Sequence, residues 1–360
     1  MIKKLLKEIH WPLVFSVFSL LTVGTLFVFS ASFHDTGHYL TRQFFWAGVG
    51  VFLLGIIPLI GYRTFLSMSY LLYVLAIFSL VLVLVLGELR LGAQRWISIG
   101  SFVFQPSEFA KLATVLALAN FLGANVHGEK ENRVILAVLA MVFLPFILIL
   151  KQPDLGSALL FLPLGIMVLF LWGMRYRTLI VAVVTGAAAL PFLWQFLKEY
   201  QKKRILVFMN PNLDPLGSGY TAIQSKIAVG SGGLFGKGYL QGTQTQLQFI
   251  PEHHTDFIFC ILGEEWGYIG SICLLVLYGL LFRAAFQIME GTTDRKAQFM
   301  IGGVLAVLFS QIFINVGMTF GLMPIAGLTL PFVSYGGSSL ITTSIAIGLI
   351  LSVYKERSIF

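Results

Sequence analysis

The sequence predicts an all-α polytopic integral membrane protein with about ten transmembrane helices. Two observations carry this prediction: 57% of the 360 residues are hydrophobic and only 11% are charged, and long apolar stretches recur along the chain. Soluble proteins contain about 45–50% apolar and about 25% charged residues. This chain therefore has too few charged side chains to cover a water-facing surface, and most of its apolar surface must face lipid.

The apolar stretches have the length that a bilayer requires. A hydrocarbon core about 30 Å thick needs roughly 20 residues in helical form. Such stretches lie at 12–30, 43–61, 67–87, 105–122, 134–150, 155–172, 178–196, 257–286, 298–320 and 333–354. They predict ten spans in one membrane domain, 1–360, although weak boundaries after Lys151 and Pro331 make eight to eleven compatible with the sequence. The basic N-terminus resembles a secretory signal, but no small-residue cleavage site follows, so we expect a retained first helix.

The distribution of Lys and Arg predicts the orientation. With ten spans and a cytoplasmic N-terminus, thirteen basic residues fall on the inner side, whereas the short outer loops hold only Arg42, Arg90, Arg95 and Lys151. An excess of Lys and Arg marks the cytoplasmic side of a membrane protein. Both termini are therefore predicted to be cytoplasmic. The net charge of +8 belongs to these membrane faces, and we expect no nucleic-acid partner.

One long extracytoplasmic loop is predicted at about 197–255. Its segment Gln201–Phe208 places basic residues beside apolar ones, as in a helix that lies at a lipid interface. A second interfacial helix is expected at 220–229, where Ile223 and Ile227 share one helical face. The glycine-rich stretch 230–238 that follows indicates backbone packed closely against another element, or backbone kept mobile.

The end of this loop carries a candidate catalytic carboxylate. Asp256 is the innermost acidic residue of a turn rich in titratable groups, directly before an apolar helix. One interpretation is that Asp256 or Thr255 caps that helix. The other is that Asp256, partly removed from water, has a raised pKa and acts as a general base. The residues alone leave both open.

Few charges lie inside the predicted spans, where they are costly and therefore mark function or a buried pair. Glu108 and Lys111, three residues apart, share a helical face. They either neutralise each other or turn a cation toward an anionic substrate. Glu264 lies two turns below Asp256 on the same face, with Glu265 beside it, and for these two a proton relay and structural hydrogen bonding both stay open.

Several site types are excluded by the residue patterns. The adjacent His253 and His254 point in different directions, and no second His or Cys group has ligand spacing, so we expect no protein-bound metal. The stretch Gly230–Gly233 lacks the Lys-Ser/Thr ending of a phosphate-binding loop, so we expect no ATP site. Work done by the protein must then draw on an ion gradient or on an activated substrate.

Six separated motifs, spread over nearly the whole chain, resemble the SEDS family of bacterial shape, elongation, division and sporulation proteins. They lie at 92–96, 105–111, 152–156, 242–247, 251–259 and 334–339. Their order and spacing match the family from end to end. The Gly-Thr-Gln-Thr-Gln-Leu motif at 242–247 resembles the elongation branch more than the division branch.

The resemblance implies a ten-helix peptidoglycan glycosyltransferase that polymerises lipid II at the outer face of the bacterial cytoplasmic membrane. It implies Asp256 as the base for the acceptor sugar hydroxyl. The other sensitive positions of the family match Arg42, Arg95, Glu108, Lys111, Asp154 and Arg204. It also implies a class B penicillin-binding protein and elongation-complex membrane proteins as partners. No tightly bound cofactor is expected, and Mg²⁺ or Mn²⁺ would bind with the pyrophosphate of the substrate.

Two other functions fit a polytopic protein. A flippase could move lipid II outward, and a scaffold could organise a cell-wall complex with Asp256 replaceable. A flippase needs polar groups along its whole path, whereas the candidates here cluster toward one face. Glu264 and Glu265 are the exceptions, and a water-filled passage lined by them would favour transport.

Overall fold

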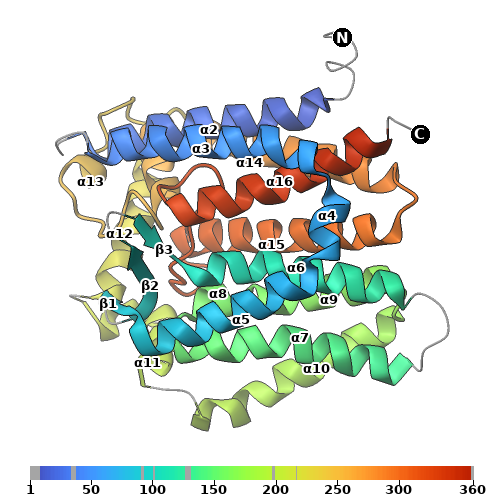
Figure 1. Ribbon diagram of the computed structural model, residues 1–360. Coiled ribbons are helices and arrows are strands. Elements are labelled where there is room, and N and C mark those ends of the chain that lie inside the picture. The colour runs from blue at the N-terminus through green and yellow to red at the C-terminus, as the bar shows by residue number, and fades with distance from the viewer. Residues whose placement is uncertain are drawn as a thin grey trace.

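The computed structural model describes residues 9–33, 38–90, 93–99, 102–125, 131–196, 199–215 and 217–357. Its long helices run side by side in a bundle (Figure 1). The long elements are α2 (Trp11–Ala31), α3 (His38–Ile60), α5 (Ser69–Leu86), α6 (Pro106–Ala124), α7 (Glu131–Lys151), α9 (Phe161–Trp172), α10 (Tyr176–Leu193), α14 (Ile258–Glu290), α15 (Arg295–Thr319) and α16 (Gly337–Arg357). The short helices α4 (Tyr62–Ser67) and α8 (Leu155–Leu159) precede α5 and α9.

The long helices lie where the sequence predicts spans. Eight described segments are long and apolar enough to cross a membrane, with α8 and α9 counted as one segment. Two further helices, α6 and α10, lie in the same bundle, α6 against α5 and α15 and α10 against α9. These ten segments lie on the ten predicted stretches. The all-α, multi-pass membrane fold is therefore confirmed.

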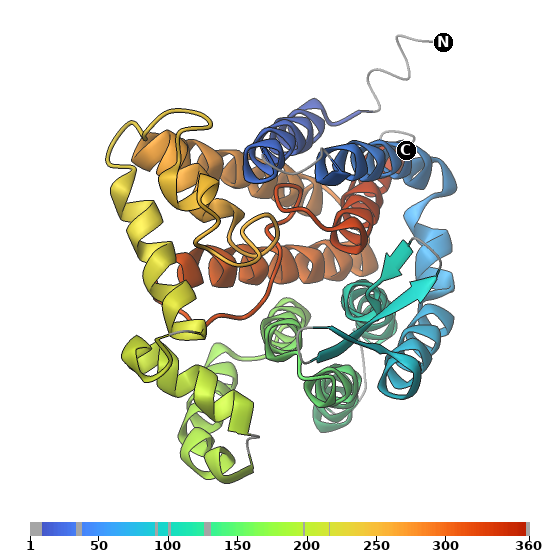
Figure 2. The ribbon, with the colours of Figure 1, turned by 90° about the vertical axis from the view of Figure 1, so that its left-hand side faces the viewer.

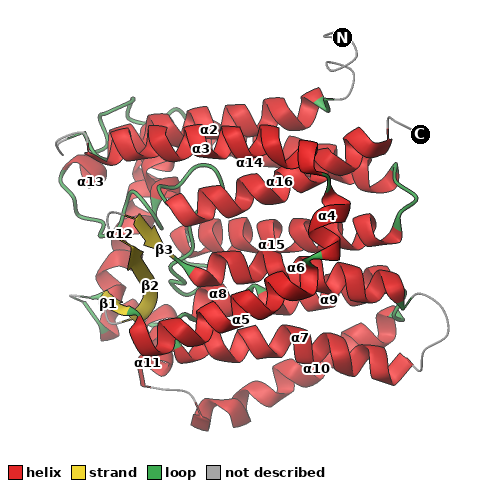
Figure 3. Cartoon of the chain, in the orientation of Figure 1, coloured by secondary structure: helices red, strands yellow, loops and turns green. Residues whose placement is uncertain are grey.

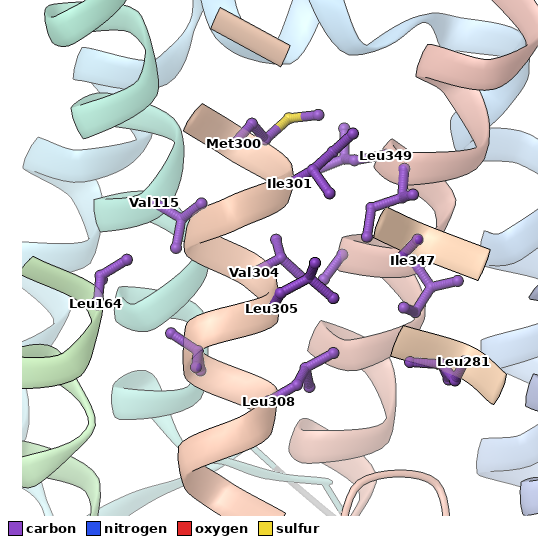
Figure 4. Close-up of a cluster of buried hydrophobic side chains, with 14 of the residues drawn as sticks. Val115, Leu164, Leu281, Met300, Ile301, Val304, Leu305, Leu308, Ile347 and Leu349 are labelled. Atoms are coloured by element: carbon purple, nitrogen blue, oxygen red, sulfur yellow. The ribbon is translucent and has the colours of Figure 1, made fainter. Parts of the chain in front are cut away.

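Helix α15 forms the centre of the bundle. In its apolar window 78% of the residues are buried, against 17% for α3. Figure 4 shows Val304, Leu305 and Leu308 of α15 among apolar side chains of the neighbouring helices. Small residues allow close approach between membrane helices, and a Cβ on Gly303 would lie 3.0 Å from Val115 Cγ1. The central helix is thus held by packing on several sides.

Short elements gather at one end of the bundle, and α2 begins and α16 ends at the other (Figures 1 and 3). Between α5 and α6 lies a three-stranded antiparallel sheet of β1 (Glu88–Arg90), β2 (Ala93–Ile99) and β3 (Phe102–Phe104). The sequence predicted only a loop there. Trp96, Ile97 and Ile99 are residue types that favour strands, which explains the pairing.

The loop 197–255 contains α11 (Glu199–Met209), a 3₁₀ turn (Pro211–Leu213), α12 (Ser218–Ser231) and α13 (Thr243–Gln246). Helices α11 and α12 lie on the two segments expected to be helical, and their position at a lipid interface stays a prediction. The packed face of α12 is not the isoleucine face, because Ile227 is 45% exposed. Gly219, Thr221, Ser225 and Ala228 are buried instead, since small side chains let α12 approach α14 closely.

Residues 320–336 connect α15 to α16 without a helix. Seen along the bundle, this segment crosses the middle of the end that carries the short elements (Figure 2). The last span was predicted to begin at 333, but α16 begins at Gly337 because residues 331–335 form turns and bends. The connection therefore lies within the polar end of the bundle, where it meets the candidate site.

Candidate functional site

Asp256 lies in the turn that leads into α14. The N-cap of this helix is Phe257, and no side chain makes a capping hydrogen bond there. The interpretation that Asp256 or Thr255 caps the helix is therefore wrong. The Asp256 side chain is half-buried, and its backbone N–H donates to the Glu252 carbonyl at 3.1 Å. The Asp256 carboxylate therefore takes no part in capping α14.

Contacts from distant parts of the chain fix this turn. Asn315 of α15 donates from Nδ2 to the Asp256 carbonyl at 2.8 Å and also to the Leu328 carbonyl. The Tyr335 N–H donates to the His254 carbonyl at 3.0 Å. Sequence reasoning missed Asn315, because a single amide in an apolar helix matches no motif. The available signal was its spacing of one helical turn from Gln311.

Arg95 of β2 faces Asp256 across Gly327. A Cβ on Gly327 would lie 3.4 Å from Asp256 Oδ2 and 3.7 Å from Arg95 Nη1. Gly327 has φ +67°, a left-handed conformation that glycine adopts without strain. The backbone can therefore run between the carboxylate and the guanidinium, which leaves both groups beside one small space.

Asp154 is the third charged residue of this site, beside Arg95. Its Oδ1 accepts from the Ser157 N–H at 3.1 Å and lies 3.6 Å from Arg95 Nη1. Arg95 also donates to the Pro153 carbonyl. Asp154 Oδ2 and Arg95 Nε are buried and have no hydrogen-bond partner among the described residues. Because buried polar atoms are normally paired, these two atoms are available to a ligand.

The surroundings of Asp256 set its protonation. The pKa of Asp256 is raised from 3.8 to about 6 in total: burial contributes most, the negative charges of Glu252 and Asp154 also raise it, and Arg95 and Thr255 lower it. A general base works best when its pKa lies near the operating pH. Asp256 is therefore mostly ionised at neutral pH and still basic enough to accept a proton.

A second polar cluster lies between α6, α15 and α16. Glu108 and Lys111 form a buried ion pair at 2.8 Å, and Lys111 Nζ also donates to Gln311 Oε1 at 3.1 Å. A cavity of about 30 Å³ borders Glu108, Lys111, Gln311 and Thr342, which is room for about one water. The pair neutralises itself and also lines a cavity, so both interpretations of it have structural support.

The segment 325–329 joins the two clusters. Gln311 Nε2 donates to the Thr329 carbonyl at 2.8 Å, and Asn315, one turn further along α15, reaches Leu328 and Asp256. Lys111 is thereby connected to the Asp256 turn through one helix face and one loop. Five of the predicted site residues, Arg95, Glu108, Lys111, Asp154 and Asp256, thus belong to one polar centre.

Of the other two predicted site residues, Arg204 lies at the edge of this polar centre and Arg42 lies outside it. Arg204 of α11 donates to the Ile325 carbonyl at 3.3 Å and lines a groove of about 20 Å³ that also contains Lys226. Arg42 is exposed on α3 and makes no hydrogen bond or ion pair with the described residues. The structure therefore brings Arg204 to the 325–329 segment and leaves Arg42 outside.

Metal ligands and intramembrane carboxylates can also be placed. Within the described ranges, no group of three or more His, Cys, Asp or Glu side chains could hold an ion. The ring nitrogens of His253 lie 2.8 and 2.9 Å from the carbonyls of Ile250 and Ala31.

Glu264 and Glu265 are fully buried and line neither of the two cavities above. Neither of these two cavities is therefore the passage, lined by Glu264 and Glu265, that would favour a flippase.

Together these features define a multi-pass membrane protein with a polar, partly buried acid–base site at one end of its bundle. The chain belongs to the family of FtsW, RodA and SpoVE cell cycle proteins, whose family model matches residues 11–359. The resemblance drawn from the six sequence motifs is therefore confirmed.

Relatives cover nearly the full length of the chain. The peptidoglycan glycosyltransferase MrdB of Escherichia coli is 42% identical over 340 residues, which cover 94% of this chain and 91% of that one. Stage V sporulation protein E of Bacillus subtilis is 39% identical over 354 residues, 95% and 96% of the two chains. The peptidoglycan glycosyltransferase RodA of Treponema pallidum is 32% identical over 428 residues, 97% and 98%.

Solved structures share the fold. A chain from a structure described as the coordination of polymerization and crosslinking by a peptidoglycan synthase complex matches with a TM-score of 0.84 and 34% identity, over 96% of this chain and 98% of that one. The rod shape determining protein RodA of Thermus thermophilus matches with a TM-score of 0.73 and 31% identity, over 96% and 97%. The arrangement of spans is thus shared with experimentally determined proteins.

Proposed function

We propose that this chain is a peptidoglycan glycosyltransferase that polymerises lipid II at the outer face of the bacterial cytoplasmic membrane, with Asp256 as general base. The observation that carries the proposal is the Asp256 carboxylate, which is half-buried, has a pKa raised to about 6 and faces Arg95 across Gly327. The names of MrdB and of the Treponema RodA support the same activity.

The chemistry needs one base and one activated donor. Asp256 accepts the proton of the acceptor sugar 4-hydroxyl while that oxygen attacks the anomeric carbon of the donor. The bond from that carbon to the pyrophosphate breaks, and undecaprenyl pyrophosphate leaves with the bonding electrons. A single displacement at an α-linked donor inverts the anomeric carbon and gives a β-1,4-linked glycan.

Cations stabilise the leaving pyrophosphate through charge-assisted hydrogen bonds. Arg95 lies beside Gly327, where an added Cβ would be 3.7 Å from its Nη1, and Arg204 donates to the Ile325 carbonyl. Lys111 uses two of its three donors on Glu108 and Gln311, which leaves one for a substrate atom. Arg42 lies further out and would meet the substrate as it enters from the lipid.

A metal ion would be held mainly by the substrate. Mg²⁺ keeps most of its waters and commonly binds one or two carboxylates together with phosphate oxygens. Asp154 Oδ2, which has no hydrogen-bond partner among the described residues, would supply one such oxygen. Mg²⁺ or Mn²⁺ bound in this way would neutralise charge on the leaving pyrophosphate.

The proposal includes a membrane orientation and a partner. The polar end of the bundle faces outward and both termini are cytoplasmic, because the basic residues favour the other end. A class B penicillin-binding protein and other elongation-complex membrane proteins are the proposed partners. The relative found in a peptidoglycan synthase complex, in which polymerization and crosslinking are coordinated, supports a crosslinking partner.

The test is a polymerisation assay. We would purify the chain alone and with a class B penicillin-binding protein whose transpeptidase serine is blocked, add labelled lipid II, and separate the products on a gel. Wild type is expected to form polymer, and Asp256→Asn none, at equal yield of folded protein. Polymer from Asp256→Asn at the wild-type rate would remove the base assignment. No polymer under any condition, with lipid II crossing sealed vesicles, would establish the flippase instead.

A further inference from the structure

Helix α14, which follows the Asp256 turn and begins at Ile258, is broken at Gly267, and a second segment fills the break. Gly267 has φ 64° and ψ −156°, so the helical hydrogen bonds stop there. Backbone groups in a membrane span need partners from the protein. Residues 233–238 supply them through four bonds: Lys237 N to Glu264 O at 3.0 Å, Gly238 N to Glu265 O at 3.0 Å, Tyr268 N to Gly233 O at 2.9 Å and Ile269 N to Leu234 O at 3.1 Å.

The glycines of this segment allow the contact. A Cβ on Gly236 would lie 2.0 Å from the Glu265 carbonyl oxygen, and one on Gly232 would lie 2.0 Å from the Gly263 carbonyl oxygen. Distances this short leave no room for a side chain. Of the two alternatives left open by the sequence, close packing and mobility, the structure shows close packing.

The Glu264 side chain reinforces this junction. Its carboxylate is fully buried and accepts five hydrogen bonds. The donors are Lys237 Nζ at 2.7 Å, Thr243 Oγ1 at 3.1 Å, the Gln244 N–H at 3.0 Å, the Thr245 N–H at 3.2 Å and Thr245 Oγ1 at 3.1 Å. A buried charge that is both paired and fully hydrogen-bonded costs little, whereas removing one partner is costly. We call Glu264, Lys237 and Thr243–Thr245 the Glu264 clasp.

The clasp closes a loop that carries Asp256. The chain leaves the clasp at Thr245, passes through the turn 247–256 and returns down α14 to Glu264. Ile250, inside this loop, is 1% exposed, and His253 contacts the Ile250 carbonyl. Both ends of the loop are therefore pinned by one carboxylate, with the catalytic carboxylate between them.

We infer that Glu264, with Lys237 as its counter-ion, is a positioning residue that sets the place of the Asp256 carboxylate by holding α13 and the glycine-rich segment against α14. The inference rests on the proposed glycosyltransferase function. Glu264 lines neither cavity and acts through Asp256 rather than on the substrate. Misplacement of a catalytic group by about 1 Å can lower a rate by roughly 10², so a loosened clasp should be visible in turnover.

The experiment compares Glu264→Gln, Lys237→Met and Lys237→Arg with wild type in the lipid II assay. The matched control is Glu199→Gln, which removes an exposed carboxylate from the Lys202 ion pair in the same outer loop. Glu264→Gln is expected to lower kcat about tenfold or more while lipid II binding stays within about twofold. Lys237→Met leaves the buried Glu264 carboxylate without its counter-ion and should also lower kcat, whereas Lys237→Arg and Glu199→Gln should stay close to wild type.

The pH profile separates positioning from a merely structural role. In wild type the acid limb of kcat should fall near pH 6, where Asp256 titrates. A loosened turn admits water, so the limb in Glu264→Gln should move down toward the ordinary value of 3.8.

Each alternative outcome has a distinct meaning. Wild-type kcat and an unmoved acid limb in Glu264→Gln would overturn the inference and leave the proposed function standing. A parallel loss of lipid II binding and kcat would also overturn it, because the residue would then act on the substrate. If Glu264→Gln fails to fold, Lys237→Met decides by the same measurements, since the Lys237 side chain is 28% exposed. Absence of polymer from wild type would instead overturn the proposed function.

Discussion

At the scale of single residues, the site depends on how a few charges are removed from water. Asp256 owes its raised pKa first to burial and then to Glu252, with Arg95 acting in the opposite direction. The same guanidinium contacts Asp154. The carboxylate is therefore balanced between neighbours that favour its protonated form and neighbours that favour its ionised form, and the charged ones can be removed one at a time.

Polymerisation should be lost as the pH falls through about 6, because Asp256 must be ionised to accept a proton. Glu252→Gln removes a negative charge that raises the Asp256 pKa, so its acid limb should lie at lower pH than that of wild type. Glu252 is exposed, and salt screens exposed charges, so the difference should shrink at high ionic strength. Initial rates between pH 4.5 and pH 8 at two salt concentrations would measure this.

Arg95→Gln should have the opposite effect. Removal of the Arg95 positive charge should raise the Asp256 pKa and move the acid limb of the rate to higher pH. If the acid limbs of Glu252→Gln and Arg95→Gln moved in the same direction along the pH axis, the charge assignments around Asp256 would be contradicted.

The Glu108–Lys111 pair can be tested for its two roles separately. Lys111→Met leaves the buried Glu108 carboxylate without its cation, which should lower the free energy of unfolding by about 3–5 kcal/mol. The double variant Glu108→Gln/Lys111→Met removes both charges and should recover most of that stability. Because the third donor of Lys111 is proposed to meet the substrate, the double variant should still polymerise at least roughly tenfold more slowly. Thermal unfolding in detergent and the polymer assay give the two values, and a double variant with wild-type activity would make the pair purely structural.

At the scale of elements, the site is assembled from ends and breaks of helices. The Asp256 turn lies at the start of α14, and Glu264 lies near the break in the same helix. Helix α15 supplies Gln311 and Asn315. Gln311 binds the 320–336 connection and Asn315 binds the Asp256 turn. Each of these positions departs from regular helix or carries an amide in an apolar helix. The irregular backbone is accommodated because neighbouring elements supply its hydrogen bonds.

Gly267→Ala should destabilise the protein. The φ and ψ of Gly267 lie in a region used almost only by glycine, where another residue costs about 1–3 kcal/mol, and an added Cβ would lie 2.4 Å from the Gly236 nitrogen. Gly279→Ala, in the same helix with nothing within 4 Å of its Cβ, is the control and should be neutral or stabilising by about 0.5–1 kcal/mol. Unfolding midpoints in detergent would compare them, and equal midpoints would mean that the break does not require glycine.

At the scale of the whole molecule, the bundle is polarised. The sheet and α11–α13 lie at one end, while α2 begins and α16 ends at the other (Figure 1). Glu108 and Lys111 lie in the first two turns of α6, close to the end that carries the sheet. An enzyme acting on a lipid-linked sugar at one membrane surface needs this arrangement, whereas a transporter needs polar groups along the whole path.

Cysteine labelling tests the proposed orientation. In a Cys273→Ser background, Glu199→Cys in α11 should react with a membrane-impermeant maleimide in spheroplasts, because its side chain is 90% exposed. Thr293→Cys, exposed between α14 and α15, should react only after lysis. The reverse pattern would place the site in the cytoplasm and remove the proposed orientation.

Much of the fold could be predicted from the sequence because the length and apolarity of a membrane span are local properties. Ten stretches of suitable length predicted the ten bundle segments, and six motifs identified the family and the residues of the polar centre. The strands at 88–104 and the packed face of α12 could not be predicted in this way. Strand pairing and helix packing depend on neighbours that are distant in the chain.

By itself, the sequence determined the class of protein, the approximate positions of its spans and the chemical groups of its site, since composition and local spacing suffice for these. Only the tertiary structure decided that Asp256 faces Arg95 across Gly327, that Asn315 holds the Asp256 turn, and that the glycine-rich segment fills the break in α14. These contacts join residues from different helices and loops. Their geometry follows from how the bundle packs, and no local pattern encodes it.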